Sequence, residues 1–269
     1  MTSTTSQIKK GKGIEGLVEG FEGKPEEERQ IELASSADMD RVVKQYGVFL
    51  GITKADTSVE SPSTAGRFDK IRTAQMCVEV LSPEQIASFM FMTHKFSAHL
   101  NYLTQTGQYA SQLVQNSYDA GNNGFLLNAG ENGDIGDLAT WLKGEKERPI
   151  EVTIIGDYGA YWGHHSENCI LHIRGNAGFS CGKTSVNLIV EIDGNAGPSC
   201  GWFTKGSIFT INGDVGESCG FGSKKSTFKT PNRETLKTMF KEVPEDNRVV
   251  FIHPDGTEEI VREYNEPYS

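Results

Sequence analysis

Three nearly identical octapeptides decide how this chain folds: GNAGFSCG at 175–182, GNAGPSCG at 194–201 and GDVGESCG at 213–220. A related segment, GDYGAYWG, occupies 156–163, so the motif G-[DN]-x-G-x-x-x-G recurs four times at a constant interval of 19 residues. Four units in unbroken register indicate a repeat protein in which each unit builds the same piece of structure. The glycines that keep this phase are Gly156, Gly159, Gly163, Gly175, Gly178, Gly182, Gly194, Gly197, Gly201, Gly213, Gly216 and Gly220.

A short apolar run precedes each glycine cluster: PIEVTIIG, NCILHIRG, NLIVEIDG and GSIFTING. Alternate positions of these runs are apolar, which is typical of β-strands. Glycine is needed where the backbone turns with positive φ or where successive coils approach too closely for a Cβ. We therefore predict a mainly β protein whose core is a right-handed parallel β-helix, a solenoid of 19-residue coils.

Units of this form and period resemble the GXGXG β-helix family, which includes the C-terminal domain of the glutamate synthase large subunit and a subunit of formylmethanofuran dehydrogenase. The resemblance covers residues 149–222 and is specific in the phase of the glycines. Family coils often continue into a further glycine-rich turn, whereas here only 205–208 has that form. In those enzymes the domain resembles a structural and docking element. The resemblance therefore implies a scaffold and carries over no catalytic residue.

The segments around the repeat divide the chain into four parts. We expect a flexible or helical N-terminal extension over 1–64 and a helical segment over 65–122 that packs on the solenoid. The GXGXG-like β-helix then covers 123–230, and a cap made of one helix and one β-hairpin covers 231–269.

The N-terminal extension contains one stretch with helical spacing, residues 37–51, which follows a cap at Ser36 or Asp38. The Ser- and Pro-containing segment 57–66 indicates a linker.

The helical segment starts at Ser82, a residue suited to cap a helix, followed by Pro83 in the first turn. The pattern then predicts either one long helix or two helices broken at Gly107. The helical pattern ends near Gly121.

The two borders of the solenoid are less regular. Residues 124–136 predict a degenerate first coil, and DLATWLKGEKE at 137–147 predicts a polar insertion with a helix. After Gly220 the 19-residue phase is lost, and 231–243 predicts a short helix. Two alternating runs around Pro-Asp-Gly at 254–256 predict a β-hairpin over 248–264.

Composition narrows the class of protein. The net charge of −10 and the pI near 5.2 oppose binding of phosphate backbones, so we expect no nucleic acid. No apolar run is long enough for a membrane helix, and the N-terminus lacks the apolar stretch of a secretory signal. Five cysteines without an export signal favour a reducing compartment, so we expect a cytoplasmic protein without a membrane partner.

Cysteines recur at one position of the repeat: Cys181, Cys200 and Cys219. Three thiols stacked about 5 Å apart could bind an iron–sulfur cluster or a soft metal ion. Reduced cysteine is also a small apolar side chain, and a ladder places its members in a line rather than around one point. We expect core packing and keep metal binding as the alternative.

The densest cluster of potential ligands comprises His164, His165, Glu167, Cys169 and His172. Their spacing matches no recognised metal site. We expect a polar surface turn, with His164 and His165 kept as alternative metal ligands.

Two further sets of polar residues fit a structural role better than a catalytic or metal-binding one. The column Asp157, Asn176, Asn195 and Asp214 suits hydrogen bonds to turn amides. Glu191 and Asp193 are outward carboxylates that an enzyme acting on polysaccharide would need, but that hypothesis rests on fold analogy alone. Because no catalytic or phosphate-binding motif is present, we predict no catalytic residue and no cofactor.

One feature favours binding. Ile170, Ile189 and Ile208 form an apolar stripe on the outward face of the strands. We expect the apolar helices between 67 and 120 to cover this stripe, and keep another protein or a second copy as the alternative cover.

The leading functional expectation is a non-catalytic structural or protein-interaction protein. It would act as a scaffold that docks a protein partner, as an accessory subunit of a larger enzyme complex or as a homo-oligomer. The alternative is a metal- or Fe–S-binding accessory protein of a redox or transferase enzyme.

Overall fold

A computed structural model of the chain describes residues 37–51, 73–130 and 134–263. The predicted linker at 57–66, the Ser36 cap and most of the predicted extension over 1–64 lie outside the described residues. The exception is α3 (Ala37–Gly51), which confirms the helix expected there.

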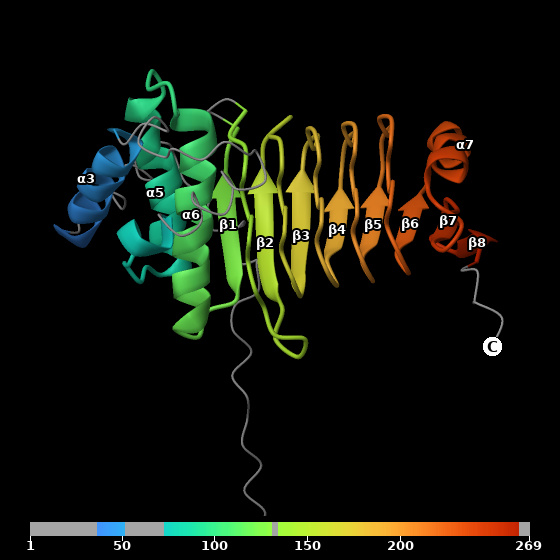
Figure 1. Ribbon diagram of the computed structural model, residues 1–269, viewed down its shortest axis with the longest axis horizontal. Coiled ribbons are helices and arrows are strands. Elements are labelled where there is room, and N and C mark those ends of the chain that lie inside the picture. Colours follow the sequence, from blue (N-terminus) through green and yellow to red (C-terminus); the bar gives the residue numbers. More distant parts are fainter. Residues whose placement is uncertain (1–36, 52–72, 131–133, 264–269) are drawn as a thin grey trace, which may run out of the picture.

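The core is one sheet of eight strands whose spatial order follows the sequence, as Figure 1 shows. Neighbouring strands from β1 to β7 are parallel, and only β8 is antiparallel to its neighbour. A mainly β parallel solenoid is therefore confirmed. The strands are β1 (Gly124–Asn128), β2 (Ile150–Ile155), β3 (Cys169–Arg174), β4 (Ile189–Ile192), β5 (Ile208–Ile211), β6 (Thr227–Thr230), β7 (Arg248–Ile252) and β8 (Glu258–Arg262).

The register of the strands follows the repeat. Ile170 pairs with Ile189 and Ile189 pairs with Ile208, so like residues stack on neighbouring coils. The phase continues one coil beyond the last glycine cluster, because Ile208 pairs with Thr227. Short bridges on the other sides of the coil, such as Ala177 with Ala196 and Val186 with Lys205, keep the same register.

The second and third glycine columns require glycine for different physical reasons. A Cβ on Gly178, in the second column, would overlap the backbone carbonyl of Tyr158 on the preceding coil. Gly182, in the third column, has φ +65°, and its Cβ would lie 2.6 Å from the ring of Phe209 in the core. Close approach of coils and left-handed backbone over a packed interior therefore both require glycine, as the sequence predicts.

The inward columns of the strands form the core. The side chains of Val152, Leu171, Val190, Phe209 and Phe228 are each fully buried. Their stacking is direct, since the Phe209 and Phe228 rings are parallel within 8° with centroids 5.2 Å apart.

The helix predicted at 137–147 is wrong. Amides of this segment bond across to the next coil rather than along a helix: Asp137 N donates to Ala160 O and Trp141 N donates to His164 O. Asp137, Ala139 and Trp141 have positive φ at alternate positions, which is incompatible with a helix. The segment is the turn side of the first, longer coil.

The helical segment consists of α5 (Pro83–Met92), a 3₁₀ turn η2 (Thr93–Phe96) and α6 (Tyr102–Asp119). Ser82 caps α5 as predicted: its hydroxyl accepts a bond from Gln85 N, and Gln85 Oε1 accepts one from Ser82 N. Neither predicted alternative is found, since two α-helices are present but they are separated between Met92 and Tyr102, and Gly107 lies inside α6. A Cβ there would overlap the carbonyl oxygen of Gly136, so this glycine lets the helix touch the first coil.

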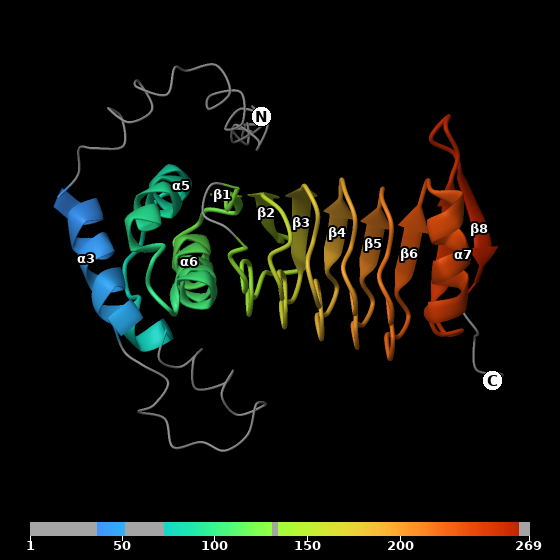
Figure 2. The same cartoon turned by 90° about the horizontal axis from the view of Figure 1, so that it is seen from above.

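Helices α3, α5 and α6 form a cap beyond β1, at the N-terminal end of the solenoid (Figures 1 and 2). Its interior is aromatic: the Tyr46 ring contacts Phe89, Phe96 and Tyr109 at centroid distances of 5.2–5.3 Å. The cap therefore buries the open end of the first coil.

At the other end, α7 (Arg233–Glu242) links β6 to β7, and β7 and β8 form the predicted hairpin. Asn232 caps the helix, accepting bonds from Glu234 N and Thr235 N. Thr235 Oγ1 donates to Gly213 O, which holds the helix on the last repeat unit.

Candidate functional site

The outward face of β3, β4 and β5 carries the predicted isoleucine stripe. Ile189 is 43% exposed, and Ile170 and Ile208 on either side of it are half-buried. The expectation that the helices between 67 and 120 cover this stripe is wrong for the described helices, because they lie past β1 at the end of the solenoid (Figure 2). Those helices cover the open end of the first coil instead.

Polar side chains border the stripe on the same face. His172 Nδ1 lies 3.4 Å from Glu191 Oε2, and both side chains are about half exposed. Arg174 and Asp193 are exposed two residues further along the same two strands. We call the surface formed by Ile170, Ile189, Ile208 and these four polar residues the isoleucine face.

The carboxylates Glu191 and Asp193 lie together on this face, two residues apart on one strand. Glu191 is engaged by His172. This contact is the one that the structure gives to the Glu191 carboxylate on this face.

The cysteine column lies in the interior. Cys181, Cys200 and Cys219 are fully buried and free, and they continue a ladder that begins with Trp162. Hydrogen bonds with the neighbouring thiols, together with burial, raise the pKa of Cys200 well above its ordinary value. Since the thiolate is the metal-binding form, the raised pKa of Cys200 favours packing of this side chain in the core over metal binding.

The histidine cluster is divided among different sides of the coil. The rings of His164 and His165 stack at 4.0 Å on the turn, and His165 Nδ1 is hydrogen-bonded to Thr184 Oγ1. Cys169 is buried inside, and burial raises its pKa to about 12. His172 lies on the isoleucine face. Among the described residues, no three His, Cys, Asp or Glu side chains group closely enough to hold a metal ion.

His164 is partly buried. Burial, with smaller contributions from His165 and Lys183, lowers the pKa of His164 from 6.5 to about 3. A neutral ring therefore occupies this turn at neutral pH.

The Asx column forms a hydrogen-bonded ladder, as predicted. Asn176 N donates to Asp157 Oδ1, Asn195 N donates to Asn176 Oδ1, and Asp214 N donates to Asn195 Oδ1, each at 2.8 Å. The oxygens that a cation would need are thus used to join successive coils.

An aromatic edge that the repeat pattern did not predict lies on the turns that follow the third glycines. Lys183 Nζ lies 4.2 Å from the Trp202 ring centroid, and Trp202 contacts Phe203 and Phe221. Phe203 and Phe221 are about half exposed. The sequence could have indicated this edge, because the 19-residue repeat places four residues in one column. Their types differ, however: His164, Lys183, Trp202 and Phe221.

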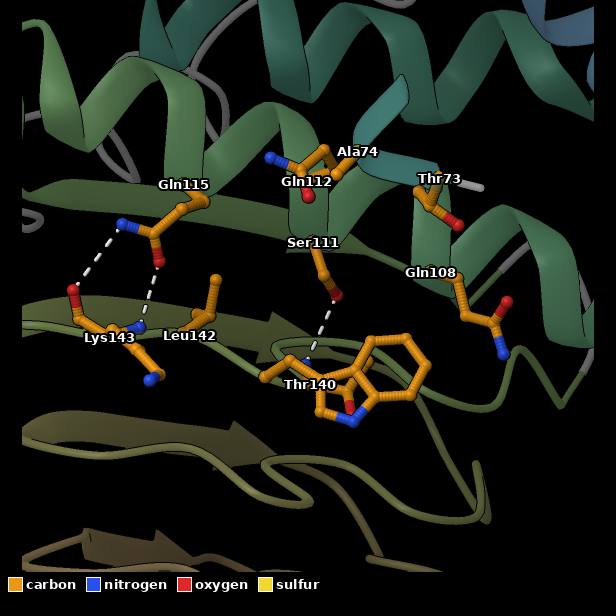
Figure 3. A pocket seen from close by; sticks show the side chains of 10 residues that line it. Thr73, Ala74, Gln108, Ser111, Gln112, Gln115, Thr140, Leu142 and Lys143 are labelled. Carbon is orange, nitrogen blue, oxygen red and sulfur yellow. Dashed lines mark hydrogen bonds between the residues drawn. The ribbon is translucent and has the colours of Figure 1, made fainter. Parts of the chain in front are cut away.

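A cleft of about 310 Å³ lies between α6 and the turn side of the first coil, and most of the residues that line it have polar side chains. Figure 3 shows how its walls are joined: Gln115 bonds to the backbone N and O of Lys143, and Ser111 Oγ accepts a bond from Thr140 N. Gln108 also lines the cleft, and its Nε2 donates to Asp137 Oδ2 at 3.2 Å. These bonds fasten the helical cap to the solenoid, so the cleft is a joint between the two.

Comparison of the chain with protein-family models, with curated proteins and with solved structures gives no match. In the part of the chain that the structure describes, no helix has both the length and the apolar character that a membrane crossing requires.

Proposed function

We propose that this protein is a non-catalytic scaffold or docking protein that binds another protein chain through the isoleucine face. The observation that carries the proposal is the position of Ile189. It is 43% exposed at the centre of three directly paired isoleucines, on a face that the described helices do not cover. Contiguous apolar side chains with a polar border are typical of a protein–protein interface.

The rigidity of this face favours the same role. Each strand is hydrogen-bonded to a neighbour on both sides from β2 to β7, and the Asx ladder ties the turns together. A surface that is already ordered loses little conformational freedom on binding, which favours affinity.

The resemblance to the GXGXG β-helix family supports this proposal, since in the named members that domain resembles a structural and docking element. On that basis the partner is a protein, in a larger enzyme complex or as a further copy of the chain. The acidic composition argues against nucleic acid as the partner.

The test is purification of the tagged full chain from its native host, in three forms. The wild type and Phe203→Asp should recover a protein at stoichiometric level, whereas Ile189→Asp should recover at least about tenfold less of it, because a charge would be buried at the centre of the interface. Phe203 is the matched control, since it is an equally exposed apolar side chain on the aromatic edge. Equal recovery with Ile189→Asp, at unchanged thermal stability, would exclude the isoleucine face as the docking site.

A further inference from the structure

The isoleucine face has a charge pattern that differs between two neighbouring strands. On β3, the outward residues after Ile170 are His172 and Arg174, which donate hydrogen bonds. On β4, the outward residue after Ile189 is Glu191, and Asp193 comes directly after the strand. Both carboxylates accept hydrogen bonds. The two strands are paired in register, so each donor lies beside an acceptor.

We infer that the partner of this face is a second copy of the same chain, related by a two-fold axis that runs parallel to the strands between β3 and β4. This inference rests on the proposed function, that the isoleucine face binds protein. It adds the identity of the partner and the register of the complex.

The proposed axis brings complementary groups together. A rotation about an axis parallel to the strands places β3 of one copy over β4 of the other and keeps each residue column over itself. Ile170 then faces Ile189 of the partner subunit, His172 faces Glu191 of the partner subunit, and Arg174 faces Asp193 of the partner subunit. The symmetry repeats each contact, as in an isologous dimer.

The same charges disfavour the other registers. An axis on β4 would place Glu191 and Asp193 against their own copies, and an axis on β3 would oppose the two Arg174 side chains. An axis perpendicular to the strands through the isoleucine column would keep Ile189 over its own copy, but it would move Glu191 over Asn187 of the partner subunit and form no contact between opposite charges. At the two central strands, only the axis between β3 and β4 combines apolar contact with opposite charges, and like charges across an interface are costly. On the flanking strands the same axis places Glu151 over Ile208 of the partner subunit, which weakens the contact.

The size of the face predicts how tight this dimer is. Four strands about 4.8 Å apart, with about five residues each on average, present roughly 300 Å² per copy. A standard stable interface buries about 800 Å² per partner. We therefore expect a dissociation constant in the micromolar range or weaker, and aligned packing of the two sheets about 10 Å apart.

The test is sedimentation of the full chain, of 29.5 kDa, over a wide range of protein concentrations. The wild type should shift from monomer to dimer as concentration rises. His172→Glu/Arg174→Glu makes both strands acidic, and Glu191→Lys/Asp193→Lys makes both basic. Each variant alone should bind itself about a hundredfold more weakly than the wild type does, because like charges then face each other.

An equal mixture of the acidic and basic variants should restore the dimer, since each basic strand would then face an acidic one. A general loss of folding would not be restored by mixing, and thermal unfolding of each variant alone checks for it. The inference is overturned if the wild type stays monomeric at the highest concentration. It is also overturned if both variants dimerise like the wild type, or if folded variants fail to associate on mixing.

The failure of this inference is distinguishable from failure of the proposed function. A monomeric wild type that recovers a different protein from the host, in an Ile189-dependent manner, would leave the scaffold function standing and overturn the second copy as partner. A self-associating wild type insensitive to Ile189→Asp would count against both.

Discussion

The regular coils and the helical cap bury their side chains according to different rules. Within the coils, a buried position is a column: Cys181, Cys200 and Cys219 share one environment, and so do Phe209 and Phe228. In the cap each buried residue is unique, as Tyr46 is, with three different aromatic neighbours and a 2.6 Å hydrogen bond to Thr106.

The coils and the cap are therefore stabilised by different kinds of contact. A coil depends on its two neighbours and on the close approach of their backbones, so damage spreads along the stack. The cap depends on side chains and on its joint with the first coil, through Gly107, Ser111 and Gln115. We expect the cap to open locally while the coils stay folded.

The largest effect is expected from Gly178→Ala, within the coils. The new Cβ would overlap the Tyr158 carbonyl, so the free energy of unfolding should fall by about 3 kcal/mol or more. Urea denaturation followed by circular dichroism measures this. Gly51→Ala is the control, since its Cβ would meet nothing within 4 Å and its change should stay within about 0.5 kcal/mol. A Gly178→Ala protein as stable as the control would refute the close approach of the coils.

A smaller and local effect is expected from Gly107→Ala, at the joint of cap and coils. The Cβ would displace α6 from the Gly136 carbonyl, while alanine favours the helix itself by about 1 kcal/mol. We expect a net loss of about 2 kcal/mol, seen as amide exchange about 30-fold faster in 102–119 and unchanged in β3–β5.

The control for this variant is Gly47→Ala, a helical glycine of the cap whose Cβ would lie 3.3 Å from the Phe96 ring. Gly47→Ala should raise the amide exchange rates in 102–119 much less than Gly107→Ala does. If amide exchange in β3–β5 rose as much as in 102–119, the cap and the coils would unfold as one cooperative unit, and local opening of the cap would be refuted.

The smallest effect concerns pH. Because the pKa of His164 is lowered to about 3 in the folded chain, the unfolded chain takes up a proton first as pH falls below 6.5. The free energy of unfolding should therefore decrease between pH 7 and 5, by about 1 kcal/mol after allowance for partial exposure. His164→Gln should lose about that much less than the wild type over this range. Equal losses in urea titrations at the two pH values would contradict a buried neutral ring.

The sequence was informative where one residue type recurs. The isoleucine column at 154, 173, 192 and 211 and the glycine columns predicted the strands, the register and the inward face, because each coil repeats the same steric requirement. The sequence did not predict the structure where a residue type is required by one tertiary contact that is not repeated. Gly107 suggested a helix break, yet the glycine serves contact with Gly136 in the first coil.

The same limit applies to the candidate site. The sequence predicted the isoleucine stripe, but periodicity contains no information about which surface the apolar helices cover, so the expected cover was wrong. The helix expected at 137–147 failed because apolar spacing alone does not reveal alternate left-handed residues such as Asp137 and Ala139. The aromatic edge was missed because Lys183, Trp202 and Phe221 share a position without sharing a residue type.

The antiparallel strand β8 has a consequence for assembly beyond one chain. A stack of parallel strands with an open end is a template on which further strands can add, and unlimited addition produces fibres. Here α3, α5 and α6 occupy one end, and β8 ends the other with strand direction reversed and with Glu258 and Glu259 exposed. The helical cap and the reversed strand thus limit the length of the stack and oppose its growth into a fibre.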